Sequence, residues 1–193
     1  MTQAPSSRTR ARRLHHKAAY DRATIDAILD AMPVAHIGHL VDGFPVVTPT
    51  LQWREGDRIY WHGSSASRMI RAATNAPVCV TVTLTDGMVL ARSALEHSVN
   101  YRCVMAFGTA EAVTDPALKA RHLETMVEQL FPGRWPELRP MTAQEVNDFI
   151  AQMRRETKSK AARIRMAEMA ISIGNISPEG KDLWRAYLAQ ERP

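Results

Sequence analysis

Tyr60-Trp61-His62-Gly63-Ser64-Ser65-Ala66-Ser67-Arg68 is the stretch that says most about this chain. Its pattern predicts a strand that ends in a turn of small residues and then enters a short helix. The turn places backbone amides, three serine hydroxyls and the Arg68 guanidinium within a few residues of one another. These are the donors that bind phosphate groups in proteins. Because a Gly/Ser turn followed by arginine is also common in structural turns, the stretch alone leaves both interpretations open.

Closely spaced strands are predicted between residues 34 and 113. The expected strands are Val34–Val41, Phe44–Trp53, Arg58–His62, Val78–Thr85, Met88–Ala91 and Tyr101–Val113. Asp42-Gly43 and Asp86-Gly87 fall between consecutive strands, and Asp-Gly is typical of two-residue hairpin turns. Pro45 and Pro49 lack N–H donors, so we expect the second strand to lie at a sheet edge or to contain a bulge. Short strands joined by tight turns favour an antiparallel barrel over alternating strand–helix units.

Helices are predicted before and after these strands. The first is expected to end at Pro33. Asp115-Pro116 combines an N-cap residue with proline at the first helical position. Thr142 and Glu145 have the spacing of a capping box, which predicts a further helix after them. Arg163–Ile173 fits either a helix or a strand, and its alternating apolar residues lead us to expect a strand.

The charge distribution argues against several partners. The formal charge is +5, but residues 1–17 hold five bases and no acid, and the rest of the 193-residue chain balances 20 bases with 20 acids. We therefore expect residues 1–17 to form a flexible basic arm and predict no nucleic-acid partner. No stretch approaches the ~20 apolar residues of a membrane span, and no apolar segment of a secretory signal follows the N-terminal bases. Cys79 and Cys103, far apart in apolar runs, indicate two buried thiols in a cytoplasmic protein.

A second polar cluster, Arg92–Arg102, separates two apolar runs. It is either a solvated connection or part of a binding site. It holds a histidine, two serines, an asparagine, a tyrosine and two arginines. His36 and His39 fall on opposite faces of one predicted strand, and no other cluster has the spacing of zinc ligands, so no metal is predicted. Glycine-rich dinucleotide, Walker and GxSxG motifs are not found in the sequence.

Five segments together carry a resemblance that none of them carries singly. They are Ala35–Gly38, Asp42–Thr50, His62–Arg68, Asp86–Ser93 and His97–Arg102, in that order. The set resembles the pyridoxamine-phosphate-oxidase-like superfamily of FMN-binding split-barrel proteins, in the flavin-nucleotide-binding branch that includes nitroimidazole-resistance proteins. The resemblance implies a mainly β (α+β) antiparallel split β-barrel with peripheral helices. It implies one FMN-binding domain over residues 18–193 that ends in a C-terminal helical extension.

The resemblance also implies a cofactor site. We expect a homodimer with two FMN molecules at the subunit interface. The FMN phosphate would be bound by Ser67 and Arg68, with Gly63 and Ser64 beside them. The edge of the isoalloxazine ring would be contacted by Thr48, Pro49, Thr50 and Leu51. A third group, from either subunit, would lie near the cofactor: Ser98, Asn100, Tyr101 and Arg102. His62 would face the flavin or the substrate pocket, which makes it the candidate catalytic residue.

The function that this resemblance implies is that of an FMN-dependent oxidoreductase. It would pass electrons from a reduced nicotinamide to a small acceptor, with a nitroaromatic acceptor expected from the resemblance alone. The alternatives are a non-catalytic flavin carrier or sensor, and a haem- or deazaflavin-binding relative. The Ser/Arg turn favours a phosphate-bearing ligand and so weighs against haem. Two departures from the family pattern are Cys103, where a serine is expected, and the helical pattern after Thr142, where a strand is expected.

Overall fold

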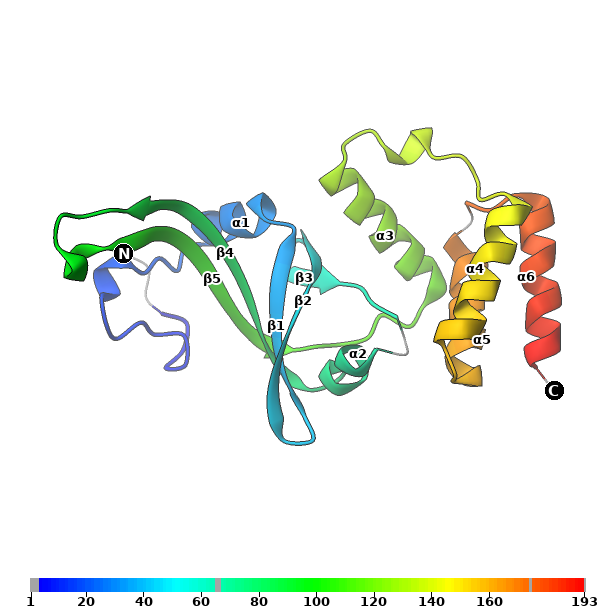
Figure 1. The fold of residues 1–193 in the computed structure, drawn as a ribbon, viewed down its shortest axis with the longest axis horizontal. Coiled ribbons are helices and arrows are strands. Elements are labelled where there is room, and N and C mark those ends of the chain that lie inside the picture. Colours follow the sequence, from blue (N-terminus) through cyan, green and yellow to red (C-terminus); the bar gives the residue numbers. More distant parts are fainter. Residues whose placement is uncertain (1–3, 65–66, 174, 193) are drawn as a thin grey trace. The chain divides into compact units, whose positions relative to one another are not determined.

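Five antiparallel strands form one sheet, in the order β3-β2-β1-β4-β5 (Figure 1). The strands are β1 (Val34–Val41), β2 (Phe44–Glu55), β3 (Arg58–Trp61), β4 (Pro77–Val89) and β5 (Ser98–Thr109). In this computed structural model, residues 4–64, 67–173 and 175–192 are described. The antiparallel α+β architecture predicted from the sequence is confirmed.

The chain divides into two units, which are described separately. The sheet unit comprises residues 1–62 and 72–110, and the helical unit comprises residues 63–71 and 111–193. The single domain expected over residues 18–193 stays a prediction. In the part of the chain that the structure describes, no helix is long and apolar enough to cross a membrane.

The hairpin of β1 and β2 forms as predicted at Asp42-Gly43. Both turn residues have positive φ angles, 52° for Asp42 and 78° for Gly43. Two consecutive positive φ angles match the right-handed twist of the paired strands, and glycine adopts such an angle without strain. The turn pairs Val41 with Phe44 and sets the register along the whole of β1.

Pro45 and Pro49 lie in the half of β2 that has a single neighbour. β2 pairs with β1 from Phe44 to Leu51, whereas β3 pairs only with Gln52–Glu55. At both prolines, therefore, one side of β2 forms a sheet edge, and no partner strand requires the missing N–H groups. Of the two alternatives predicted for these prolines, a sheet edge or a bulge, the structure shows the edge.

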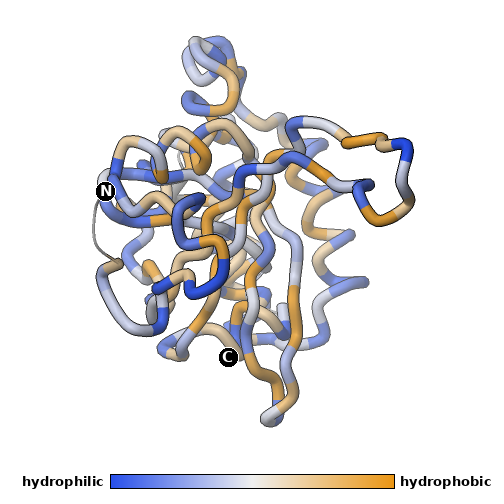
Figure 2. Tube along the Cα trace, turned by 90° about the vertical axis from the view of Figure 1, so that its left-hand side faces the viewer, coloured by the Kyte–Doolittle hydropathy of each residue, from blue (hydrophilic) through white to orange (hydrophobic). Residues whose placement is uncertain are grey.

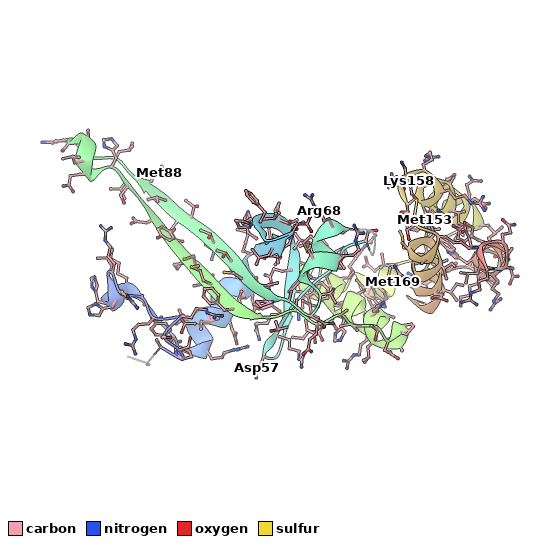
Figure 3. All side chains as sticks on the ribbon, turned by 90° about the horizontal axis from the view of Figure 1, so that it is seen from below. Asp57, Arg68, Met88, Met153, Lys158 and Met169 are labelled. Carbon is pink, nitrogen blue, oxygen red and sulfur yellow. The ribbon has the colours of Figure 1, made fainter. Side chains whose placement is uncertain are left out.

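The hairpin of β4 and β5 extends well beyond the rest of the sheet. β1 pairs with β4 only at Cys79–Thr81, whereas β4 and β5 remain paired as far as Val89 and Ser98. Figures 1 and 3 show this projecting hairpin, with Met88 toward its free end.

The hairpin turn predicted at Asp86-Gly87 is wrong. β4 runs through this pair, and the register shift between Thr85 and Gly87 marks an irregularity that accommodates one extra residue. The connection is made later, by residues 90–97 with the short 3-10 helix η2 (Ala94–Glu96). Of the separate strand expected at Met88–Ala91, Met88 and Val89 therefore form the end of β4, and the other two residues belong to the connection. β5 begins three residues before the predicted Tyr101.

Helix α1 (Arg22–Ala31) covers one face of the sheet, which we call the inner face. Asp21 caps the helix by accepting a hydrogen bond from the Thr24 amide, 2.9 Å away. Ile28 and Leu29 of α1 are buried, as are Ile37, Val80 and Val82 on the inner face of the strands, among other residues. This apolar contact holds α1 on the sheet.

The opposite face of the sheet, which we call the open face, carries apolar side chains at exposed positions. Its exposed apolar residues include Val34, Leu40, Val47, Tyr101, Met105 and Phe107. Within the described part of the sheet unit, no helix covers these side chains. Figure 2 shows hydrophobic residues recurring along the strands. Contiguous apolar surface of this kind is typical of interaction sites.

Four longer helices form the helical unit. They are α3 (Pro116–Leu130), α4 (Ala143–Glu156), α5 (Lys160–Ile173) and α6 (Pro178–Glu191). The predicted N-cap of α3 is confirmed, because Asp115 accepts a hydrogen bond from Leu118 N at 2.8 Å. The predicted capping box of α4 is confirmed at Thr142 and Glu145. The core of the unit contains Trp184, which is fully buried.

The strand predicted at Arg163–Ile173 is wrong, because these residues belong to α5. The alternation of apolar residues suggested a strand, but Ala, Arg, Met and Glu dominate the first half of the segment and are all strong helix formers. Arg163 Nη1 also donates to the carbonyl oxygens of Thr157 and Lys158, at 2.8 and 3.1 Å, just before the helix.

Candidate flavin site

The structure places Thr50 beside His62 in the sheet unit. Thr50 lies on β2 and His62 directly follows β3, and Thr50 Oγ1 donates a hydrogen bond to the backbone oxygen of His62 at 3.4 Å. This contact follows from the antiparallel register, in which Gln52 pairs with Trp61. Two of the site residues predicted from the sequence are therefore brought together.

The remaining residues of the Thr48–Leu51 segment alternate between the two faces of β2. Thr48 and Thr50 pair with the buried residues Ile37 and Ala35, so their side chains lie on the inner face. Pro49 and Leu51 lie on the open face. A ligand approaching this segment from one face would therefore meet two of the four side chains, together with backbone groups.

An aromatic pair that the sequence analysis did not single out lies next to His62. Trp53 and Tyr60 stack with ring centroids 5.6 Å apart and planes 18° apart, and the His62 ring lies 6.3 Å from Trp53. Trp53 is buried and donates from Nε1 to Glu55, whereas His62 is exposed. The cluster thus presents an exposed imidazole beside a fixed aromatic wall. The sequence signal that could have revealed this pair is the tight turn at Glu55–Asp57. A hairpin closed by this turn places Trp53 opposite Tyr60.

The predicted phosphate-binding turn lies in the helical unit. Ser67 N donates to Ser64 O at 2.8 Å, and Arg71 N donates to Ser67 O at 3.2 Å, so the turn leads directly into α2 (Arg68–Ala73). The Arg68 side chain is exposed (Figure 3). Ser65 and Ala66 lie outside the described residues. The turn and the helix entry predicted here are confirmed.

Gly63 lies close to the side chain of Ile70. A Cβ atom at position 63 would lie 3.0 Å from Cγ1 of Ile70, so a larger residue would require the Ile70 side chain to shift by a few tenths of an ångström. Because α2 has only six residues, its dipole is small, and charge attraction for an anion would come chiefly from Arg68.

The candidate residues of β5 do not share one face. Tyr101 lies on the open face and is 57% exposed, whereas Arg102 lies on the other face and pairs with Asp86. Arg102 Nε donates to Asp86 Oδ2 at 3.0 Å and Nη2 donates to Oδ1 at 2.8 Å. These hydrogen bonds lower the pKa of Asp86 below its ordinary value.

Within one chain, β5's candidate residues are remote from those of β2. Pro49 pairs with His36, His36 with Thr81, and Thr81 with Met105. Tyr101 lies four residues further along β5, which is about 13 Å along the strand and about 14 Å across three strand spacings, or roughly 20 Å in all. One sheet therefore does not bring the two segments together.

The histidines do not assemble a metal site. His36 is exposed on the open face, and His39 is buried on the inner face, with Nδ1 3.1 Å from Ile37 O. Their predicted placement on opposite faces is confirmed. Among the described residues, no three His, Cys, Asp or Glu side chains are grouped to hold a metal ion.

Comparison with known proteins identifies the family. The model of the pyridoxamine 5'-phosphate oxidase family matches residues 21–163, so the chain belongs to this family. The structure is similar to that of the flavocytochrome Anf3 from Azotobacter vinelandii, with 51% identity over 76% of this chain and 68% of that chain, and a TM-score of 0.69. It is also similar to the FAD and heme binding protein from Mycobacterium smegmatis, with 38% identity, 66% and 62% coverage, and a TM-score of 0.60. A search of curated proteins gave no match.

The family resemblance inferred from the sequence is thereby confirmed, and so is its split-barrel fold class. The chemistry of the residues present fits a flavin phosphate and ring. In the helical unit, Arg68 is an exposed cation that follows a turn with serine hydroxyls. In the sheet unit, the half-buried Tyr60 and the exposed His62 lie against the buried Trp53.

Proposed function

We propose that this protein binds a flavin and transfers electrons through it. The observation that carries the proposal is the similarity, at 51% and 38% identity, to a flavocytochrome and to an FAD- and heme-binding protein of the same fold. The aromatic pair beside His62 and the Arg68 turn supply the kinds of group that flavin binding requires.

The proposed contacts follow the chemistry of each segment. The bound flavin would supply reversible transfer of one or two electrons. Arg68 and Ser67, with Gly63 and Ser64, would hold the phosphate of FMN, or of the FMN half of FAD, through charge-assisted hydrogen bonds. The backbone and side chains of Thr48–Leu51 would contact the edge of the ring. The imidazole of His62 would orient a substrate or exchange a proton with it.

The proposed reaction is electron transfer from a reduced nicotinamide to a small acceptor, with a nitroaromatic as a candidate acceptor. The alternative within the same site is a flavin carrier or sensor without turnover. The exposed His62 favours the enzyme, because an imidazole at the surface, held against the ring of Trp53, can reach a substrate and exchange a proton with it.

We also propose that the site is completed in a homodimer. The open face exposes apolar side chains, and the candidate residues of β2 and β5 lie roughly 20 Å apart in one chain by strand spacing. A two-fold pair would let β5 of one copy approach β2 of the other. Sedimentation equilibrium tests this proposal, and a monomer that is saturated with flavin would contradict it.

The experiment that tests the flavin proposal is a titration of the apoprotein with FMN and FAD, followed by flavin fluorescence. Arg68→Ala should weaken binding by about 10–100-fold, because one charge-assisted contact contributes ~1.5–3 kcal/mol. Arg185→Ala, an exposed arginine on α6, is the control and should leave affinity unchanged. No binding of either flavin by the wild-type protein would refute the proposal, and equal affinity of Arg68→Ala and wild type would remove Arg68 from the site.

Haem is a second candidate ligand, favoured by the similarity to a flavocytochrome and to an FAD and heme binding protein. Neutral imidazole is a common axial ligand of haem iron. His36 and His62 expose their side chains in the sheet unit and could serve. A Soret band on reconstitution with haemin, lost in one histidine-to-alanine variant only, would support this function. Free-haemin spectra in all proteins would exclude it.

A further inference from the structure

A row of side chains in the sheet unit connects Glu55 to His62. Trp53 Nε1 donates a hydrogen bond to Glu55 Oε1 at 2.9 Å. The Trp53 indole stacks on Tyr60 at 5.6 Å, and the His62 ring lies 6.3 Å from Trp53 with its plane inclined by 49°. Aromatic rings attract one another at centroid separations of about 4.5–7 Å. The exposed imidazole is therefore connected to the Glu55 carboxylate through one buried indole ring.

The strand register places these four side chains together. Glu55 follows Trp53 by two residues on β2, and Trp53 pairs with Tyr60 across the hairpin of β2 and β3. Residues two apart on a strand, and residues directly opposite on the neighbouring strand, point to the same face of the sheet. His62 follows Tyr60 by two residues and continues this row. The contacts are thus a property of the β2–β3 hairpin itself.

The turn that carries Glu55 is hydrogen-bonded to helix α1. Gly56 O accepts a hydrogen bond from Arg22 Nη2 at 2.7 Å and another from Arg54 Nη1 at 3.0 Å. Arg22 belongs to α1, and Arg54 Nη2 donates to Asp30 of the same helix at 2.6 Å. Two guanidinium groups therefore hold the backbone beside Glu55, so that its carboxylate offers the indole an acceptor in a fixed place.

The orientation of the His62 ring depends on Trp53. The His62 backbone oxygen accepts a hydrogen bond from Thr50, but no hydrogen bond of the imidazole nitrogens is found within the described residues. The ring contact of His62 is with the indole of Trp53. An indole that loses its N–H partner can turn about its side-chain bonds, and the imidazole packed against it then moves as well. Such movement matters for proton exchange, because a displacement of about 1 Å can cost about 100-fold in rate.

We propose that Glu55 is a positioning residue for His62. By accepting the indole N–H, it fixes the ring of Trp53 and hence the imidazole that packs on this ring. The inference rests on the proposed function, in which His62 orients a substrate or exchanges a proton with it. The role requires an acceptor oxygen and no negative charge, since the amide oxygen of glutamine accepts the same hydrogen bond.

The test measures reduction of a nitroaromatic acceptor by the flavin-loaded protein with saturating reduced nicotinamide. Glu55→Ala should lower kcat about 10-fold and leave flavin affinity unchanged. Glu55→Leu, which keeps the bulk without an acceptor, replaces it if that variant does not fold. Glu55→Gln keeps the acceptor oxygen and should retain the wild-type rate. Asp57→Ala is the matched control, because it removes an exposed carboxylate of the same turn that pairs with Arg22. It should leave kcat unchanged.

A double variant shows whether Glu55 acts through His62. Glu55→Ala/His62→Gln should be no slower than His62→Gln alone, because the imidazole to be positioned is gone. As a readout without turnover, the imidazole proton resonances of His62 should shift in Glu55→Ala, and stay in place in Glu55→Gln and Asp57→Ala.

The outcomes separate this inference from the proposed function. A wild-type rate in His62→Gln overturns the proposed role of His62 and this inference with it. A slow His62→Gln together with a wild-type rate in Glu55→Ala overturns the inference alone. Losses that add in the double variant, equal losses in Glu55→Gln and Glu55→Ala, or unmoved His62 resonances in Glu55→Ala also overturn it.

Discussion

Arg102 and Asp86 face each other across the irregular part of the β4–β5 hairpin, joined by hydrogen bonds of 2.8, 3.0 and 3.2 Å. Asp86 is the residue at which the register of β4 shifts, so the extra residue places its carboxylate against the guanidinium. The Asp86 side chain remains 37% exposed and the Arg102 side chain 57% exposed. An exposed ion pair of this kind contributes only about 0–1 kcal/mol to the free energy of unfolding. Stability alone therefore does not account for the pair.

We predict that Arg102 contributes to flavin binding and that Asp86 restrains it. Arg102→Ala should lower flavin affinity about 10-fold, whereas Asp86→Asn frees the guanidinium and should leave affinity equal or higher. Because the pair is exposed, both variants should unfold within about 1 kcal/mol of the wild type. Flavin titration and urea denaturation measure the two effects. Equal loss of affinity in both variants would instead mean that the pair only shapes the hairpin.

A buried glutamine joins α1 to the sheet. Gln52 is 2% exposed, and its Nε2 donates to Leu29 O and Met32 O, each at 2.7 Å. The residue four positions after Leu29 is Pro33, which has no N–H group to complete the helical hydrogen bond. Gln52 therefore satisfies a carbonyl that the helix itself leaves without a donor.

Gln52→Leu should consequently destabilise the sheet unit by about 2–4 kcal/mol, since one buried and one partly buried carbonyl oxygen lose their side-chain donor while the volume is nearly conserved. Gln152→Leu is the matched control, because Gln152 is exposed on α4 and donates only to Glu156. Its effect should remain under about 0.5 kcal/mol. Urea denaturation of both variants provides the measurement, and a similar loss in the two would show that Gln52 has no special role.

Features set by neighbouring residues were predictable from the sequence. The Asp42-Gly43 hairpin and the caps at Asp115 and Thr142 depend on a few adjacent backbone angles and side chains, and all three form as expected. Asp86-Gly87 has the same local signal, yet its partner Arg102 lies sixteen residues away and the strand continues through it. The preference of Asp-Gly for a turn is overridden where the residues before and after it both pair with the neighbouring strand.

The candidate site was predictable only in part, for the same reason. The resemblance named Thr50 and His62, and their contact depends on the register of β2 with β3. The stack of Trp53 on Tyr60 depends on the same register and was not foreseen. The argument that the phosphate-binding turn weighs against haem stays a prediction.

Acid should weaken the start of α4 through Glu145. Hydrogen bonds from Arg139, and next from Thr142, lower the pKa of Glu145 from 4.5 to about 2. A lowered pKa means that the ionised form is favoured in the folded state, so its contribution is present above about pH 4.5 and is lost as the pH falls toward about 2. Glu145→Gln should therefore lower the melting temperature at pH 7, and its difference from wild type should shrink between pH 5 and pH 2. A constant difference across that range would contradict the assignment.

His62 decides between an enzyme and a carrier. Its ring is exposed and lies 6.3 Å from the buried Trp53, so replacement by glutamine keeps a polar group of similar reach without disturbing the core. Histidine is the side chain that ordinarily changes charge between pH 5 and 8, and glutamine does not titrate. If His62 exchanges a proton with the substrate, His62→Gln should bind flavin with unchanged affinity but turn over an acceptor about 10–100-fold more slowly, with a flattened pH profile. Flavin titration and stopped-flow kinetics across pH 5–8 provide the two measurements. Identical rates and profiles in the two proteins would make His62 a structural residue and leave the carrier function as the better account of the site.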